Sequence, residues 1–138
     1  MKNLSANIIV QFSSGKRLKG FKGNCQFVHG YTHKVQASFT SSKLENNMVV
    51  DFYELKKTIE DWINKNWDHN LLLNKRDKKL GDFINAYTGQ KTFYFEGDPT
   101  SENMGMYLKD KVFPKLLPNL ICTKVVVYDN DTSFIEVI

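Results

Sequence analysis

The sequence has little cysteine and no long apolar run. Of its 138 residues only Cys25 and Cys122 are cysteines, and they lie far apart in the chain. This excludes the framework of a disulfide-stapled domain and indicates a reducing compartment. No segment approaches the ~18 apolar residues of a membrane span. The first residues lack the apolar stretch and cleavage site of a signal peptide. We therefore expect a cytoplasmic protein with no membrane partner.

Repeats, linkers and low-complexity segments are also absent. Apolar residues make up 41% of the chain and aromatic residues 13%, which excludes the composition of a disordered protein. A chain of 138 residues is the size of one ordinary domain. Residues 1–138 are therefore expected to form a single domain that needs neither a disulfide nor a structural metal for its core.

The charge balance is only moderately basic. There are 19 basic and 15 acidic residues, which gives a net charge of +4. The basic residues are densest at Lys16, Arg17, Lys19 and Lys22. Base-stacking aromatic residues do not line this stretch, so no nucleic-acid partner is expected. A solvated loop and a site for a phosphorylated small substrate both remain open.

Hydrophobic periodicity predicts an α+β domain. Asp51 and Glu54 resemble a capping box at the start of the clearest helix, and Pro99 stands in the first turn of a second long helix that Pro114 and Pro118 bound. Residues 68–74 are expected to form a loop. The expected helices are 51–65, 77–87 and the segment from about 98 to 114; the expected strands are 7–12, 26–39, 91–96, 120–128 and 132–138. This order favours an antiparallel sheet with helices on one face.

Two short segments contain residues suited to proton transfer. Cys25 stands four residues before His29, beside Lys22. It is either a small buried hydrophobic residue or a thiolate of lowered pKa. Asp68 directly precedes His69. This pair is either a helix cap with a packed ring or a proton-transfer pair whose carboxylate fixes the imidazole tautomer.

Two further segments are suited to binding a polar ring. The run Pro99-Thr100-Ser101-Glu102-Asn103 either caps a helix or presents backbone N–H groups, hydroxyls and a carboxylate to a ligand. The run from Val125 to Asn130 is typical of a strand that ends in a turn, and it carries the carboxylate of Asp129. Each segment taken alone is explained by local structure.

Taken together, these motifs resemble the 6-pyruvoyl-tetrahydropterin and 6-carboxytetrahydropterin synthase family. Phe12-Ser-Ser-Gly-Lys-Arg-Leu18 is similar to the family's Phe-Ser-Ala-Ala-His-Arg-Leu, and Met48-Val-Val-Asp51-Phe52 to its Gly-Met-Val-x-Asp-Phe. The Cys-x-x-x-His spacing resembles the bacterial 6-carboxytetrahydropterin branch. The similarity continues through Asp68-His69-x-x-Leu72, Pro99-Thr-Ser-Glu-Asn103 and the terminal Val-Tyr-Asp129, and so covers nearly the whole chain.

The resemblance implies the tunnelling fold. In this fold a four-stranded antiparallel sheet carries two long helices on one face. The sheets of three subunits join into a barrel, and two trimers commonly stack. The expected protein is therefore a homo-oligomer, a trimer or a hexamer, with its sites between subunits.

The resemblance also implies a lyase that acts on dihydroneopterin triphosphate. Family enzymes eliminate triphosphate and rearrange the side chain of the pterin. The pyruvoyl branch feeds biopterin synthesis, while the carboxy branch also releases acetaldehyde and feeds queuosine biosynthesis. By position, the general base is Cys25, the second proton-transfer pair is Asp68 and His69, and the pterin-binding residues are Thr100, Ser101, Glu102 and Asp129.

The chain departs from the family at the zinc site. The family's three zinc ligands are histidines, and their positions here hold Lys16, His29 and Tyr31. A lysine amine is protonated at neutral pH and is a poor zinc ligand. His33 is four strand residues from His29, or about 13 Å along a strand, so the two could share an ion only if the chain bends sharply at Gly30. His29 is thus the one remaining metal-ligand candidate. Zinc binding stays open, and no other cofactor is expected.

Two hypotheses follow from this departure. In the first, the protein is still a pterin lyase, and the Lys16 ammonium at the lost ligand position stabilises a developing oxyanion. In the second, the protein is a non-catalytic pterin-binding module that uses Glu102 and Asp129. A structural homo-oligomer without a ligand is a third alternative, but it leaves four site-like segments unexplained.

Overall fold

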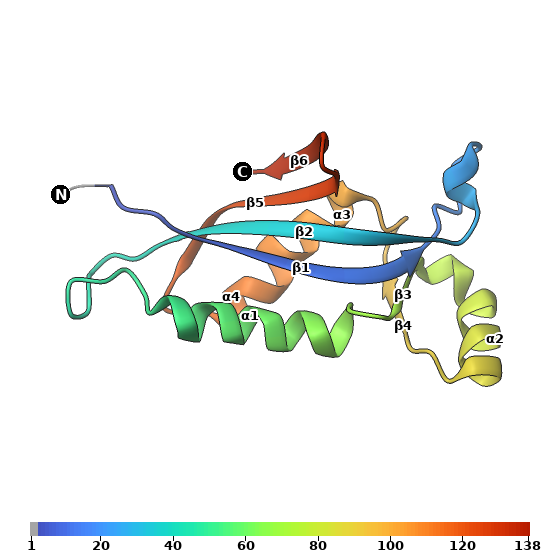
Figure 1. Cartoon of the computed structure of the whole chain (residues 1–138), viewed down its shortest axis with the longest axis horizontal. Coiled ribbons are helices and arrows are strands. Elements are labelled where there is room, and N and C mark those ends of the chain that lie inside the picture. The colour runs from blue at the N-terminus through green and yellow to red at the C-terminus, as the bar shows by residue number, and fades with distance from the viewer. Residues whose placement is uncertain (1–2) are drawn as a thin grey trace.

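The computed structural model describes residues 3–138 and contains a six-stranded mixed sheet (Figure 1). The strands follow the order β4-β3-β1-β2-β5-β6 across the sheet. The neighbours β1 and β2, β2 and β5, and β5 and β6 pair antiparallel, whereas β3 pairs parallel with both β1 and β4. The strands are β1 Ala6–Lys16, β2 His29–Thr40, β3 Leu71–Asn74, β4 Thr92–Phe95, β5 Ile121–Asn130 and β6 Ser133–Val137.

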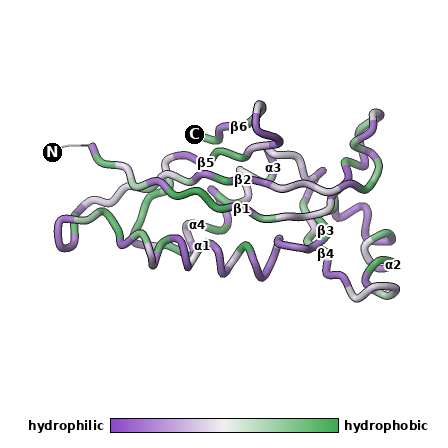
Figure 2. The backbone as a smooth tube through the Cα atoms, viewed as in Figure 1, coloured by the Kyte–Doolittle hydropathy of each residue, from purple (hydrophilic) through white to green (hydrophobic). Residues whose placement is uncertain are grey.

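Helices cover one face of this sheet. The core joins the inner side chains of β1, β2 and β5 to apolar stripes of α1 and of the α3–α4 segment. Figure 2 shows mostly hydrophilic residues along α1, as expected for a helix with one buried stripe. The helices are α1 Phe52–Asn66, α2 Lys78–Thr88, α3 Ser101–Tyr107 and α4 Phe113–Leu116, with a π-helical turn at Leu108–Val112 and 3-10 turns at Asn24–Gln26 and Lys75–Asp77.

The expected α+β class is confirmed, but the sheet has six strands and is mixed. Residues 68–74 were expected as a loop, and this is wrong for Leu71–Asn74, which form β3. This short buried strand pairs on both sides, with β1 and with β4, so its apolar residues show no alternation. The helical segment begins at Ser101, so Pro99 precedes it and is not in its first turn as expected. It runs past Pro114, because that proline lies in the first turn of α4, where its missing N–H needs no partner.

One side of α1 carries a buried apolar stripe. Asp51 caps the helix by accepting hydrogen bonds from the N–H groups of Tyr53 and Glu54. Leu55, Ile59 and Ile63 are buried, whereas Phe52 at the first turn is exposed. No helix in the described part of the chain is long and apolar enough to cross a membrane.

One end of the sheet carries most of the predicted site residues. The loop of residues 17–28 connects β1 to β2 at this end, and α2 packs nearby (Figure 1). The β3 strand begins here, beside the last residues of β1. The first residues of β1 and residues 41–50 lie at the opposite end (Figure 1).

Candidate active site

A row of side chains lines the inner face of β1 and β2 where they meet the loop of residues 17–28. The two strands pair without a break along their whole length. Alternate residues of a strand share a face, and the buried residues of β1 place one set inside. The opposite pairs in this row are Lys16 with His29, Ser14 with Tyr31, and Phe12 with His33.

Lys16 ends this row as a buried cation. Its side chain is 2% exposed, and none of the ion pairs among residues 3–138 includes it. Its Nζ lies 3.9 Å from the sulfur of Met104 and 4.7 Å from the centre of the Tyr31 ring. Burial lowers the pKa of Lys16, while the charges of Asp129, Cys25 and Glu102 act in the opposite direction.

Tyr31 fills the space between the two histidines of β2. Its ring centroid lies 4.7 Å from that of His29 and 5.2 Å from that of His33. Burial is the main cause that raises the pKa of Tyr31 to about 12, and Asp129, the charge of Cys25 and a hydrogen bond with Cys25 contribute. The phenol therefore stays protonated at neutral pH and faces the Cys25 side chain.

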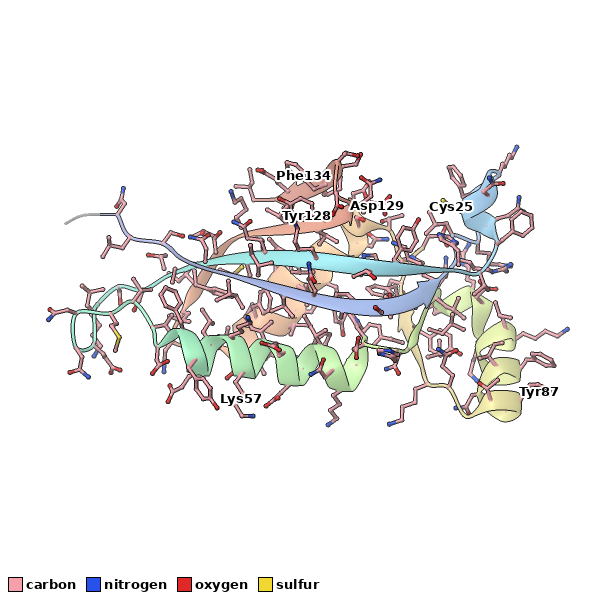
Figure 3. All side chains as sticks on the ribbon, in the orientation of Figure 1. Cys25, Lys57, Tyr87, Tyr128, Asp129 and Phe134 are labelled. Atoms are coloured by element: carbon pink, nitrogen blue, oxygen red, sulfur yellow. The ribbon has the colours of Figure 1, made fainter. Side chains whose placement is uncertain are left out.

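Cys25 lies in the 3-10 turn of the connecting loop and is a half-buried free thiol. Its carbonyl accepts a hydrogen bond of 2.7 Å from the Leu18 N–H, which closes the loop behind it. The effects of Cys25 and Asp129 on Lys16 and Tyr31 indicate that these four residues form one cluster. In Figure 3, Cys25 and Asp129 lie toward the same end of the molecule.

Two carboxylates that sequence reasoning did not assign to the site hold this loop in place. Asp98 accepts hydrogen bonds from the backbone N–H groups of Lys19 and Gly20, at 3.1 and 2.9 Å. A Cβ atom on residue 20 would lie 3.0 Å from the Asp98 carboxylate, so glycine suits this close approach. Asp77 binds the Arg17 guanidinium through both oxygens, at 2.5 and 2.7 Å. No local pattern reveals these contacts, because the partners are 60 or more residues apart.

The first turn of α3 faces the end of β5. Thr100 caps the helix, because its Oγ1 accepts a hydrogen bond of 3.1 Å from the Asn103 N–H. Ser101 is buried and donates from Oγ to the Asp129 carboxylate at 3.4 Å. Glu102 is exposed in the same turn. This segment therefore caps α3 through Thr100 and also binds the Asp129 carboxylate through Ser101.

Asp68 and His69 form a hydrogen-bonded pair beside the edge of β1. Asp68 accepts from the Ser13 N–H at 3.0 Å, and its second oxygen lies 2.8 Å from Nδ1 of His69. Burial alone raises the pKa of Asp68, but the bonds from Ser13 and His69 and the charge of His69 bring it below its usual value. His69 has a backbone φ of 57° and an 81% exposed side chain. An imidazole that donates its Nδ1 proton to Asp68 presents Nε2 outward as a proton acceptor.

The structure does not bring this pair into direct contact with the thiol. Among the described residues no hydrogen bond or ion pair joins Asp68 or His69 to Cys25 or Lys16. His69 does, however, line an open pocket of about 450 Å³ together with Tyr31 and Ser14. The Asp68–His69 pair therefore lies at the same end of the sheet as the thiol, next to β3.

The residues at the three expected zinc positions do not fit a zinc ion. The positions of Lys16, His29 and Tyr31 lie together on one face. The buried Nε2 of His29 has no hydrogen-bond partner and suits a ligand. The other two groups are an ammonium, which repels a cation, and a phenol with a pKa of about 12. No set of three His, Cys, Asp or Glu side chains suited to a metal occurs within residues 3–138.

His33 does not complete a metal site with His29. The register of β2 against β1 is continuous from His29 onward, so the strand does not bend to bring the two rings together. The ring of Tyr31 packs against both imidazoles. His33 is instead fully buried, and neither of its ring nitrogens has a hydrogen-bond partner.

We predict that His33 makes the stability of the fold depend on acid. Burial, and then the charge of Lys16, lowers the pKa of His33 from 6.5 to about 3, while the backbone of Tyr128 acts in the opposite direction. Below pH 6.5 the unfolded chain therefore binds a proton that the folded chain excludes, so stability falls by about 1.4 kcal/mol per pH unit between these two values. Urea unfolding at pH 7 and pH 5 is expected to show a loss of about 2 kcal/mol for this group.

The matched variant for this prediction is His33→Phe, which keeps a ring between Phe12 and Tyr31. It is expected to lose less stability between pH 7 and pH 5 than the wild type. The exposed Tyr87 on α2 serves as the control, and Tyr87→Ala should keep the wild-type dependence. Equal pH dependence of the wild type and His33→Phe would contradict the prediction.

Comparison with known proteins identifies relatives over nearly the whole chain. Residues 6–138 match the family model described as 6-pyruvoyl tetrahydropterin synthase. A protein of Rickettsia typhi named 6-carboxy-5,6,7,8-tetrahydropterin synthase is 38% identical over 131 residues, which are 93% of this chain and 95% of that protein. A protein of Rickettsia conorii with the same name is 35% identical over the same shares.

Solved structures show the same fold. An uncharacterised protein from Wolinella succinogenes superposes with a TM-score of 0.74 at 19% identity and covers 98% of both chains. A 6-pyruvoyltetrahydropterin synthase variant from Plasmodium vivax superposes with a TM-score of 0.69 at 15% identity, again over 98% of both chains. The subunit architecture of the expected tunnelling fold is thereby confirmed, with a six-stranded mixed sheet in place of the expected four-stranded antiparallel one.

Proposed function

Since the chain belongs to the 6-pyruvoyl tetrahydropterin synthase family, we propose that it is a pterin lyase of the 6-carboxytetrahydropterin synthase type. The substrate is dihydroneopterin triphosphate, which loses triphosphate and then acetaldehyde. The observation that carries the proposal is the cluster of Cys25 with a buried cation, Lys16, and the carboxylate of Asp129 at one end of the sheet. Residues 1–138 act as one domain of this type.

The pterin ring binds at the first turn of α3. Its amino and ring N–H groups are donors that a carboxylate accepts in pairs. Glu102 provides an exposed carboxylate in this turn, and Ser101 holds Asp129 nearby. The Thr100 hydroxyl accepts a helix N–H through Oγ1 and still has a proton to donate to the ring.

The chemistry takes place on the side chain of the pterin. Cys25 acts as the thiolate: its sulfur takes a proton from a side-chain carbon and becomes the thiol, and the electron pair of the C–H bond stays on the substrate. The C–O bond to triphosphate then breaks, and its electrons leave with the phosphate. Lys19 and Lys22 on the exposed connecting loop attract this leaving group. Asp68 and His69 form the second proton-transfer pair, with Nε2 of His69 as the exchanging atom.

The assembly follows from the open sheet. Its edges are β4 and β6, and neither edge pairs with another strand within the described chain. Pairing of these edges between copies produces a homo-oligomer, a trimer or a hexamer. Such an assembly brings the Asp68–His69 pair of one subunit to the thiol of another.

The alternative function is a pterin-binding module without turnover. It is favoured by the changed residues at the zinc positions, Lys16 and Tyr31. Turnover of dihydroneopterin triphosphate by the purified protein, followed by triphosphate and acetaldehyde release, distinguishes the two functions. We expect release of both products. Tight pterin binding with no triphosphate release would establish the binding module instead.

A further inference from the structure

A buried ammonium without an ion pair lies at the centre of the cluster. Removing a lysine charge from water costs several kcal/mol unless a partner compensates for it. The Nζ of Lys16 has a thioether at 3.9 Å and an aromatic face at 4.7 Å, and both are weak partners. The charges of Asp129, Cys25 and Glu102 favour the cation without closing an ion pair with it. The ammonium therefore retains free hydrogen-bonding capacity.

The imidazole of His29, close to Lys16, has an acceptor atom without a donor. His29 lies directly opposite Lys16 in the strand register, and both side chains contact the ring of Tyr31. Nδ1 of His29 donates to the Phe27 carbonyl at 2.6 Å, which leaves Nε2 as an acceptor. This Nε2 is buried and has no hydrogen-bond partner. The site thus pairs a donor that has only a thioether as its hydrogen-bond partner with an acceptor that has no partner.

A hydroxyl group satisfies both at once, because it accepts one hydrogen bond and donates another. A metal ion satisfies only His29 and is repelled by Lys16. We propose that Lys16 and His29 form a metal-free hydroxyl-binding site, which holds the side-chain oxygen next to the carbon that Cys25 deprotonates. This rests on the proposed function, since the hydroxyl belongs to the pterin side chain.

The role of the cation follows from the proton transfer. When the C–H bond breaks, the proton moves to the Cys25 sulfur and the electron pair remains on the substrate. The Lys16 ammonium stabilises the negative charge that develops there, while Nε2 of His29 keeps the hydroxyl oriented. The reaction then requires no divalent ion.

Binding of two pterins tests the site without relying on turnover. The probes are dihydroneopterin, whose side chain carries hydroxyls, and 6-methyldihydropterin, which lacks them. We expect the wild type to prefer the hydroxylated ligand by about 10- to 100-fold, as for hydrogen bonds to a charged group. Lys16→Met should remove most of this preference and leave the affinity for 6-methyldihydropterin unchanged. The exposed Lys43, at the opposite end of the molecule, gives the matched control, and Lys43→Met should keep the preference.

Each outcome decides the proposal. Equal affinity of the wild type for both ligands, or a preference that survives in Lys16→Met, overturns the hydroxyl site but leaves the pterin lyase intact. Binding of neither ligand overturns the proposed function as well. If Lys16→Met fails to fold, the wild-type comparison and the variant His29→Phe decide in its place, since His29→Phe removes the acceptor and should also weaken the preference.

Metal analysis provides an independent readout. The purified wild type is expected to hold less than stoichiometric zinc, and triphosphate release should resist a strong chelator. One zinc per chain, with activity lost to the chelator and restored by zinc, would refute a metal-free site.

Discussion

Replacing Cys25 by alanine is expected to lower the rate of triphosphate release by about 10²- to 10⁴-fold, the contribution of a positioned general base. The affinity for dihydroneopterin should change little, because the ring-binding groups belong to α3 and β5. The loop that carries residue 25 keeps its anchors at Asp77 and Asp98, so the variant is expected to fold. Steady-state release of triphosphate and pterin binding on the same preparation measure both effects.

The second free cysteine is the matched control for this experiment. Cys122 lies in β5, and burial raises the pKa of its thiol to about 11. The thiol is therefore protonated at neutral pH and cannot accept a proton, and Cys122→Ala should keep the wild-type rate. A Cys25→Ala variant that releases triphosphate at the wild-type rate would assign the base to another group.

Replacing Trp67 by alanine is expected to lower the free energy of unfolding by about 3–5 kcal/mol, as for other buried aromatic residues. The side chain is fully buried at the C-terminal end of α1. Its removal leaves a cavity amid a cluster of rings whose centroids lie 5.2–5.9 Å away: Trp62, Phe12, Phe95 and Phe93. The loss is a large share of the roughly 5–15 kcal/mol that stabilises a domain.

Urea unfolding of Trp67→Ala measures this loss. Tyr87 on α2 is the control, because its ring is 82% exposed and Tyr87→Ala should change stability by less than about 0.5 kcal/mol. A smaller loss is expected for Trp67→Phe, since Nε1 of Trp67 has no hydrogen-bond partner to lose. Similar losses for Trp67→Ala and Tyr87→Ala would contradict the assignment of Trp67 to the core.

The position of Trp67 also connects the core to the proposed chemistry. The N–H groups of Trp67 and Asp68 both donate to the Ile63 carbonyl at 2.8 Å, so the packed indole directly precedes the Asp68–His69 pair. A cavity at residue 67 frees this turn to shift. We therefore expect Trp67→Ala to reduce turnover at temperatures where the variant is still folded.

The sequence by itself determined the main helices, the long strands and the family. The α1 stripe repeats with the helical period and begins at a capping aspartate, so local chemistry specifies both its buried face and its start. Alternate residues of a strand share a face, so the expected strand over 26–39 implies one face for His29, Tyr31 and His33, and the structure has them there. The site motifs resemble those of the family in their order along nearly the whole chain, and this order predicted the family's fold.

Only the tertiary structure decided the strand β3 and the environment of Lys16. A four-residue apolar strand has no measurable period, and it becomes a strand through its pairing with β1 and β4. A lysine in a basic stretch resembles a solvated residue, and its 2% exposure arises from α3, which brings Met104 against it across 88 residues of sequence. The same holds for Asp98, whose partners at residues 19 and 20 are almost 80 positions away. Such contacts depend on how distant segments pack, which no local pattern encodes.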